Sequence, residues 1–415
     1  MIHPNFPKAA IVAALTALPI LPAHAVAQDK NTYSTIERGL YLTRAGDCAA
    51  CHTSDPEKPY AGNYPLATPF GTIHSSNLTP DDATGLGKWT ADDFYKAMNE
   101  GKRPDGSGLY PAFPYTHFTL VTREDSEAIF AYLKTLEPVS QKVEKPGFPF
   151  PLNERVVMKG WNALNFDDRK FTPVDGKSAE WNRGYYLAEG LGHCAMCHSP
   201  KNMLGAEENG AAAYTGGMAE GWFAPPLKAH GNAPGLSDWS KKDVSDYLKY
   251  GRNEQTAAFG PMADVISKST RYLSDPDLEA LAAYLTDLPN TQEKDNTKTG
   301  STQEAASSDT GKLVYDTQCA ACHGAQGEGV KLQFAKLAGS NIVQSDNPTT
   351  LLRVILEGTK AVPTAKYPTP HAMPAFNWKL KNDEVVAVAN YVRNAFGNSA
   401  PAVSSSDVEK LRQGS

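Results

Sequence analysis

Three parts of the 415-residue chain repeat one pattern of apolar and polar positions. At the end of each repeat, a polar residue is followed by acidic residues and then by an apolar stripe that contains a tyrosine. Thr, Ser and Asn are good helix N-caps, and acidic residues in the first turn suit the helix dipole. The pattern therefore predicts three closing helices, each with one apolar face. The polar starters are Thr122, Ser274 and Asn382, and the tyrosines are Tyr132, Tyr284 and Tyr391.

Each repeat also opens with a helix-like segment that carries one glycine. These glycines are Gly39, Gly184 and Gly311. A glycine has no side chain, so two helix backbones can approach each other closely at its position. We expect the opening and closing helices of each repeat to cross there, beside the tyrosines. The predicted fold is therefore mostly α-helical, with an irregular segment between the two helices.

A five-residue motif, Cys-x-x-Cys-His, follows the opening segment of each repeat. On one helical turn, two thiols can bond the vinyl groups of one porphyrin, and the histidine can bind its iron. A redox dithiol, a zinc site or a disulfide is the alternative for a single copy. Three copies use all six cysteines, so we expect three covalent c-type haems. The haem-bonding residues are then Cys48, Cys51, Cys194, Cys197, Cys319 and Cys322, and the proximal iron ligands are His52, His198 and His323.

A haem iron with one histidine ligand has a second axial position, which Met or His closes in most electron-transfer cytochromes. Met262 and Met373 each stand just before the closing helix of their repeat. That position suits a loop that crosses the distal face of the haem, whereas core filling is the alternative use of a methionine. We predict Met262 and Met373 as sixth ligands of the second and third irons.

The first repeat has Phe113 where the other repeats have methionine. Phenylalanine cannot bind iron. The spacing from His52 to His117 nearly equals that from His198 to Met262, and we therefore predict His117 as the sixth ligand of the first iron. The alternatives are His74, Met98, an open coordination site, or a surface role for His117.

The first two repeats share one further segment, which the third lacks. Thr90 and Ser240 are positioned to cap the helix that follows, and Trp89 and Trp239 directly precede these caps. The indole N–H could donate to a haem propionate, or the ring could pack against the haem edge.

The N-terminus has the three parts of a secretory signal peptide, which we place at residues 1–25. Lys8 precedes an apolar run, and small residues up to Ala25 offer a cleavage position. The run is shorter than the roughly 20 apolar residues of a membrane-spanning helix. Because bacteria attach haem to this motif after export, we expect the mature chain in the periplasm. The formal charge of −6 argues against nucleic-acid binding, which requires a basic surface.

The repeats and their spacers predict a domain plan. A Pro-rich spacer with interleaved aromatic residues indicates a stiff strap, and a polar spacer indicates a flexible linker. The haem domains span residues 32–140, 176–289 and 310–398, the strap 141–175, the flexible linker 290–309, and a polar, frayed tail 399–415.

The order of helix, haem motif, irregular middle and closing helix resembles class I cytochrome c domains. The resemblance implies three tandem domains of this type, each wrapped around one covalent haem. Over residues 38–396 the chain also resembles the triheme cytochrome c subunits of bacterial periplasmic membrane-associated dehydrogenases of the alcohol, gluconate and aldehyde type. The stretches that carry this resemblance include residues 45–47, 71–73, 77–81, 109–112, 181–184, 192–194 and 260–262.

This resemblance implies a dehydrogenase catalytic subunit as electron donor and ubiquinone or a terminal oxidase as acceptor. It also implies peripheral attachment to the outer face of the cytoplasmic membrane. An electron relay without catalysis of its own fits the absence of a nicotinamide or flavin fingerprint, a hydrolase triad or a spare cysteine. A multihaem enzyme such as a peroxidase, with an open first haem, and a haem-based sensor are the alternatives.

Overall fold

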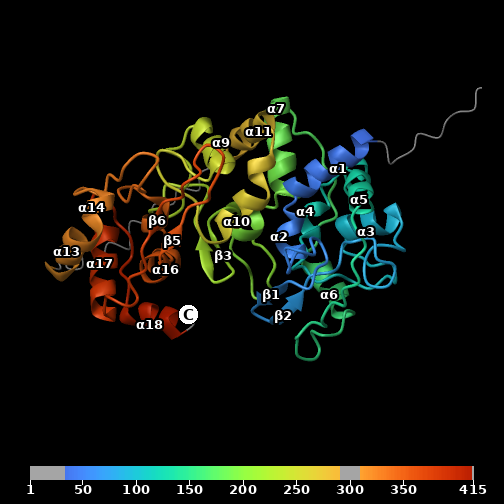
Figure 1. Ribbon diagram of the computed structural model, residues 1–415, viewed down its shortest axis with the longest axis horizontal. Helices are drawn as coiled ribbons and strands as arrows, with labels where there is room; N and C mark the ends of the chain where they lie inside the picture. Colours follow the sequence, from blue (N-terminus) through green and yellow to red (C-terminus); the bar gives the residue numbers. More distant parts are fainter. Residues whose placement is uncertain (1–32, 290–308, 414–415) are drawn as a thin grey trace, which may run out of the picture.

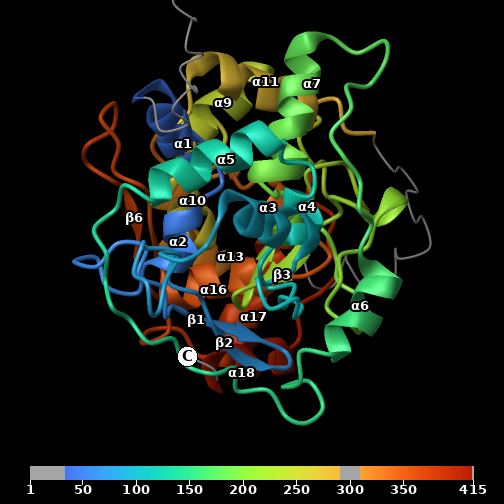
Figure 2. The same cartoon turned by 90° about the vertical axis from the view of Figure 1, so that its right-hand side faces the viewer.

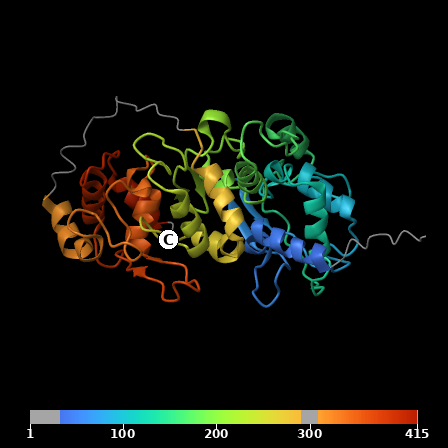
Figure 3. The same cartoon turned by 90° about the horizontal axis from the view of Figure 1, so that it is seen from above.

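The computed structural model describes residues 33–289 and 309–413, which form three mostly helical domains in a row (Figures 1 and 3). Each domain has an opening helix, a haem motif on a short helix, a middle region with one two-stranded sheet, and a closing helix. The predicted fold class is confirmed. The predicted signal peptide and nearly all of the predicted flexible linker lie outside the described residues.

In the first domain the opening helix α1 packs against the closing helix α5. Strands β1 and β2 are antiparallel, with Pro65 opposite His74. Thr90 caps α3 and Thr122 caps α5, because each side chain accepts a hydrogen bond from a first-turn N–H, as predicted. The elements are α1 Tyr33–Ala45, α2 Cys48–His52, β1 Pro65–Thr68, β2 Gly71–His74, α3 Ala91–Glu100, α4 Tyr115–Phe118 and α5 Arg123–Leu133.

The second domain repeats this order, and its opening helix α7 continues into a π-helical segment, η1. Ser240 caps α9 and Ser274 caps α11, as the sequence predicts. Strands β3 and β4 are antiparallel, with Gly217 opposite Ala224. The elements are α7 Ala179–Tyr185, η1 Tyr186–Leu191, α8 Ala195–His198, η2 Gly210–Ala212, β3 Gly217–Ala219, β4 Trp222–Ala224, α9 Lys241–Tyr250, α10 Pro261–Lys268, η3 Thr270–Tyr272 and α11 Asp275–Leu285.

The third domain has the shortest sheet, in which Thr359 pairs with Met373. The predicted cap Asn382 is instead the first residue of α17, and Lys381 occupies the cap position. The elements are α13 Asp309–Val314, η4 Tyr315–Cys319, α14 Ala320–His323, α15 Asn341–Gln344, α16 Thr349–Glu357, β5 Thr359–Lys360, β6 Ala372–Met373, α17 Asn382–Asn394 and α18 Ser405–Gln413.

Helix α18 corrects the expectation of a frayed C-terminal tail. Val403 and Val408 are buried in the core of the third domain. Arg412 donates hydrogen bonds to the carbonyl oxygens of Asn377 and Leu380. The polar composition concealed this helix, since a few buried apolar side chains are enough to fix it to the domain.

The opening and closing helices cross at the predicted glycines. A Cβ atom built on Gly39 would lie 1.9 Å from the carbonyl oxygen of Ala128, and one on Gly184 would lie 1.9 Å from that of Ala280. The corresponding distance at Gly311, to a carbonyl oxygen of α17, is 2.4 Å. No side chain fits into such a gap, so the crossings require glycine. The predicted role of the three glycines is therefore confirmed.

The strap between the first two domains adheres to the first domain. The N–H of Gly147 donates to the carbonyl oxygen of Thr72 at 2.8 Å. The rings of Tyr110 and Phe148 pack edge to face at 4.9 Å. The strap passes along β1 and β2 and then forms α6, Val157–Asn165 (Figure 2). This region is held by specific contacts, as expected of a stiff strap.

The first two domains share one hydrophobic core, whereas the third has a core of its own. The shared core includes Leu42 and Ile129 from the first domain and Leu187 and Leu281 from the second. The first two domains therefore form one packing unit.

Candidate haem sites

The three motif histidines have the same orientation. In each, ring nitrogen Nδ1 lies within hydrogen-bond distance of a backbone carbonyl oxygen. Burial lowers the pKa of all three imidazoles, so Nδ1 donates its proton to the carbonyl and Nε2 keeps its lone pair. A proximal iron ligand needs this arrangement. The pairs are His52 with Ser76 at 2.7 Å, His198 with Pro225 at 2.7 Å, and His323 with Ala335 at 2.8 Å.

The second haem motif and the predicted sixth ligand of its iron line a single cavity. This cavity of about 280 Å³ contains Cys194, Cys197 and His198 on its walls together with Met262. Trp239 is a further lining residue, as are many apolar side chains. A c-type haem is held by two thiols, one or two axial ligands and an apolar surround. The residues of the cavity supply all of these, so they fit the haem.

Residues of the third domain complete the wall of this cavity. Asn341 and Thr350 both line it. The Thr350 hydroxyl accepts a hydrogen bond from the N–H of Phe223 at 2.9 Å, and the Asn341 amide donates to the carbonyl oxygen of Pro226. Neither residue is part of a haem motif, so a reading of each domain by itself could not identify them. Only the docking of the third domain on the second shows that these two residues line the cavity.

The first and second haem motifs lie next to each other. A Cβ atom on Gly46 would be 3.4 Å from the Leu191 side chain, across the boundary of the two domains. Burial raises the pKa of Cys51 to about 12, with further contributions that include one from nearby Cys197. None of the six cysteines forms a disulfide in the structure. The first two haem motifs are therefore neighbours across the boundary of the two domains.

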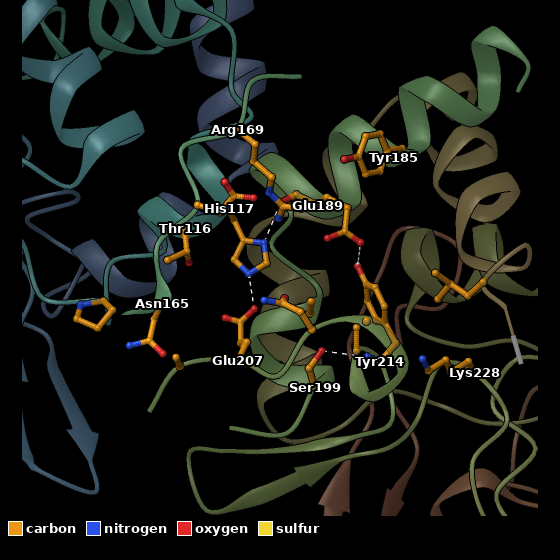
Figure 4. A pocket seen from close by; sticks show the side chains of 18 of the residues that line it. Thr116, His117, Asn165, Arg169, Tyr185, Glu189, Ser199, Glu207, Tyr214 and Lys228 are labelled. Carbon is orange, nitrogen blue, oxygen red and sulfur yellow. Dashed lines mark hydrogen bonds and ion pairs between the residues drawn. The ribbon is translucent and has the colours of Figure 1, made fainter. Parts of the chain in front are cut away.

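His117 lies beside Glu189 and Glu207 of the second domain (Figure 4). Its Nδ1 is 2.8 Å from the carbonyl oxygen of Glu189, and its Nε2 is 2.6 Å from the Glu207 carboxylate. Burial opposes protonation of the ring, but the hydrogen bond and charge of Glu207 outweigh it and raise the pKa of His117. Both nitrogens are thus engaged by protein groups, and this arrangement does not support ligation of the first iron by His117.

The His117 side chain lines a separate polar cavity of about 460 Å³. Tyr214 and Tyr284 both donate to the Glu189 carboxylate there. Sequence spacing gave no indication of these contacts, because Glu189 and Glu207 belong to another domain. His117 is therefore a buried residue of the domain boundary, where spacing alone predicted an iron ligand.

The remaining candidates stand in different surroundings. Phe113 packs edge to face on Phe118 at 5.3 Å, and Met98 is buried in the shared core. His74 lies on β2, with Nε2 3.7 Å from Glu144. In the third domain, Met373 on β6 packs against the domain core.

Comparison with known proteins agrees with the repeated sites. The cytochrome c family model matches residues 36–137 and 308–396. The chain is 39% identical over 409 residues to the gluconate 2-dehydrogenase cytochrome c subunit of Pantoea cypripedii, covering 94% of this chain and 92% of that protein. The chain belongs to the cytochrome c family. It is also 38% identical over 422 residues to the alcohol dehydrogenase (quinone) cytochrome c subunit of Gluconobacter oxydans, covering 98% and 87% of the two chains. A third relative is the fructose dehydrogenase cytochrome subunit of Gluconobacter japonicus, 34% identical over 410 residues, covering 92% and 83%.

These relatives are named as cytochrome subunits of dehydrogenases, which agrees with an electron-transfer role for the chain and not with a catalytic one. The alternative of a multihaem peroxidase is not supported. The family model leaves the middle repeat unmatched, yet that repeat supplies the motif residues of the 280 Å³ cavity. Within residues 33–289 and 309–413, no helix combines the length and apolar composition needed to cross a membrane.

Proposed function

We propose that this cytochrome carries three covalent haems and passes electrons from a dehydrogenase catalytic subunit to ubiquinone or a terminal oxidase. The observation that carries the proposal is the common orientation of His52, His198 and His323. Each of these imidazoles is held by a backbone carbonyl through Nδ1, which leaves Nε2 for iron.

The proposed sites use the six motif cysteines for attachment and the three motif histidines as proximal ligands. Met262 and Met373 are the proposed sixth ligands of the second and third irons. Met262 lines the same cavity as His198, which supports the second assignment. Thioether ligation raises the reduction potential of a haem relative to bis-histidine ligation. The proposal assigns only His52 to the first iron.

The proposed electron path has the second haem in the middle. The motif around Cys51 adjoins the motif around Cys197, and the third domain contributes Asn341 and Thr350 to the wall of the second cavity. Haem groups in this order could exchange electrons stepwise. We place the mature protein in the periplasm, peripherally attached at the outer face of the cytoplasmic membrane, with the predicted signal peptide directing export.

Haem counting tests the proposed content. We expect mass spectrometry of the denatured mature chain to give three haem additions per polypeptide, because thioether bonds survive denaturation. The double replacement of Cys194 and Cys197 by Ala should leave two additions. A count of two for the unmodified chain would contradict the proposal.

Reduction of the native complex tests the relay. We expect the substrate of the catalytic subunit to reduce all three haems in the intact complex and none in the cytochrome chain purified alone. Added ubiquinone, or the purified oxidase, should then reoxidise the haems. Substrate-dependent reduction of the isolated chain would contradict the assignment of catalysis to a partner.

A further inference from the structure

Arg252 is a buried cation at the boundary between the second and third domains. It follows Gly251, the C-cap of α9, and its backbone forms an isolated β-bridge with Ala257. The residue is only 3% exposed. A buried charge is unfavourable unless an opposite charge or hydrogen bonds compensate it. The surroundings of Arg252 therefore indicate what compensates its charge.

The protein satisfies only part of the Arg252 guanidinium. Its Nη1 donates to the carbonyl oxygen of Leu332 at 3.3 Å, and its centre lies 4.6 Å from the Tyr367 ring centroid. Nε and Nη2 are both buried and have no hydrogen-bond partner in the part of the chain that the structure describes. The nearby Glu254 carboxylate pairs instead with Lys331, at 2.7 Å. Two adjacent donors thus lack an acceptor.

Nε and Nη2 are the two donors with which an arginine holds a carboxylate bidentately. This chain uses that fork elsewhere: Nε and Nη2 of Arg183 each donate to the Asp277 carboxylate at 2.8 Å. The free fork of Arg252 therefore has the shape and charge to hold a carboxylate.

The cation at the equivalent position in the first domain does not lack an acceptor. Lys102 follows Gly101, the C-cap of α3, and forms the equivalent bridge with Gly108. Its side chain is 57% exposed and pairs with Glu100 at 2.8 Å. A cation at this point of the repeat can therefore be solvated and paired locally. Arg252 differs because the third domain covers it.

Arg252 lies at the boundary between the domains of the second and third proposed haem sites. Its contacts, Leu332 and Tyr367, lie in the third domain between His323 and Met373, the two proposed ligands of the third iron. The turn that follows Arg252 contributes Gln255 to the wall of the second haem cavity. Each c-type haem carries two propionate carboxylates, which are anions of the kind that the free fork of Arg252 can hold.

We propose that Nε and Nη2 of Arg252 bind a haem propionate, contributed by the second or the third haem, at the boundary between these domains. The proposal rests on the proposed haem content. The positive charge of Arg252 stabilises the reduced, ferrous form of that haem, so Arg252 raises the reduction potential of the haem. Arg252 is thus a positioning residue that ties the relative placement of two domains to the potential of one haem.

The decisive experiment is a spectroelectrochemical titration of the full-length, haem-loaded protein with Arg252→Met. We expect the redox equilibrium of one haem to shift about ten-fold toward the ferric form, which corresponds to about 59 mV for a one-electron couple. The reduction potentials of the other two haems should not change. The matched control Lys102→Met should move none of the three. Arg252→Lys keeps the charge but loses the fork, so its shift should be smaller than that of Arg252→Met.

The two propionate sources can be separated by marking one haem at a time. Met262→His lowers the potential of the second haem and Met373→His that of the third, since imidazole replaces thioether. Whichever marked haem moves again on Arg252→Met supplies the propionate. If Arg252→Met does not fold, Arg252→Gln carries the same expectation.

Haem counting keeps two failures apart. Fewer than three haems per chain would overturn the proposed function. If three haems are present but neither Arg252→Met nor Arg252→Gln changes any of their reduction potentials, only the role of Arg252 is overturned. The same holds if Lys102→Met changes the potentials as much as Arg252→Met does.

Discussion

The two boundaries between successive domains are built differently. The first and second domains share one apolar core and two reciprocal hydrogen bonds: Tyr41 donates to Asp277 at 2.6 Å, and Tyr186 donates to Asp125 at 2.6 Å. The third domain has its own core and contacts the second through hydrogen bonds such as those of Thr350 and through a small apolar cluster that includes Ile266 and Val362. The first boundary is therefore the interior of one unit, and the second is a contact between two units.

Buried cationic groups at these boundaries show the same difference. His117 has an acceptor at each ring nitrogen, supplied by Glu189 and Glu207. Arg252 leaves Nε and Nη2 without a partner in the described residues. The cation at the first boundary is thus fully hydrogen-bonded by protein groups, whereas the cation at the second keeps two donors, for which we propose a haem propionate.

The largest expected effect comes from the helix crossings that build the shared unit. Gly39→Ala would place a methyl group 1.9 Å from the Ala128 carbonyl oxygen. We expect a loss of about 3 kcal/mol or more in the free energy of unfolding, measured by urea unfolding of the haem-loaded protein. In α6, Gly160 has no atom within 4 Å of an added Cβ, so Gly160→Ala is the control and should be neutral or stabilising. Equal midpoints for the two variants would refute the close crossing.

The reciprocal hydrogen bonds should have a smaller effect. Tyr41→Phe combined with Tyr186→Phe removes one hydroxyl from each aspartate. We expect a loss of about 1–3 kcal/mol in the free energy of unfolding, because a buried acceptor is left with fewer donors. Tyr33 is 77% exposed, so Tyr33→Phe is the control and should leave the unfolding midpoint in place. Separate unfolding transitions of domains one and two in the wild type would contradict the shared unit.

Replacement of His117 tests the first boundary and the first iron together. We expect His117→Ala to lower the unfolding free energy by about 1–2 kcal/mol near pH 6, while absorption and electron paramagnetic resonance spectra of the haems stay unchanged. Appearance of a high-spin haem in the variant would instead identify His117 as an iron ligand of the haem-loaded protein.

The pH dependence of this effect has a definite sign. The raised pKa of His117 gives stability that is present below pH 6.5 and is lost as pH rises through the folded-state pKa. The Glu207 pKa is lowered: burial opposes this shift, but the hydrogen bond of His117 outweighs it. Its contribution is present above pH 4.5 and is lost as pH falls. The difference between wild type and His117→Ala should therefore be largest between about pH 4.5 and 6.5. A constant difference from pH 4 to pH 9 would rule out the pair as its source.

The smallest effects are expected at the second boundary. Thr350→Val removes a buried hydroxyl that bonds both backbone groups of Phe223, and should cost about 1 kcal/mol of the contact between the second and third domains. Lys331→Ala removes only an exposed pair with Glu254 and should have no measurable effect. Hydrogen exchange at the Phe223 amide is the measurement, since that N–H donates to Thr350. Faster exchange in Lys331→Ala than in Thr350→Val would reverse this ranking.

Local patterns in the sequence were enough to predict much of the protein. The three haem motifs, the three helix-crossing glycines and the caps Thr122 and Ser274 follow from chemistry within a few residues or from exact repetition. Such features can be predicted without knowledge of distant contacts, because a thioether motif or a glycine at a helix crossing has the same role wherever it occurs. The mostly helical, three-domain plan followed from them.

Tertiary structure alone decided the contacts between repeats. Spacing predicted an iron ligand at His117, but Glu189 and Glu207 from the neighbouring domain bind both of its nitrogens. The docking of the third domain buries Arg252, whereas Lys102 at the equivalent point of the first repeat stays exposed. The repeated sequence pattern shows which elements each domain contains. Hydrogen bonds and burial across the domain boundaries depend instead on how the domains pack together.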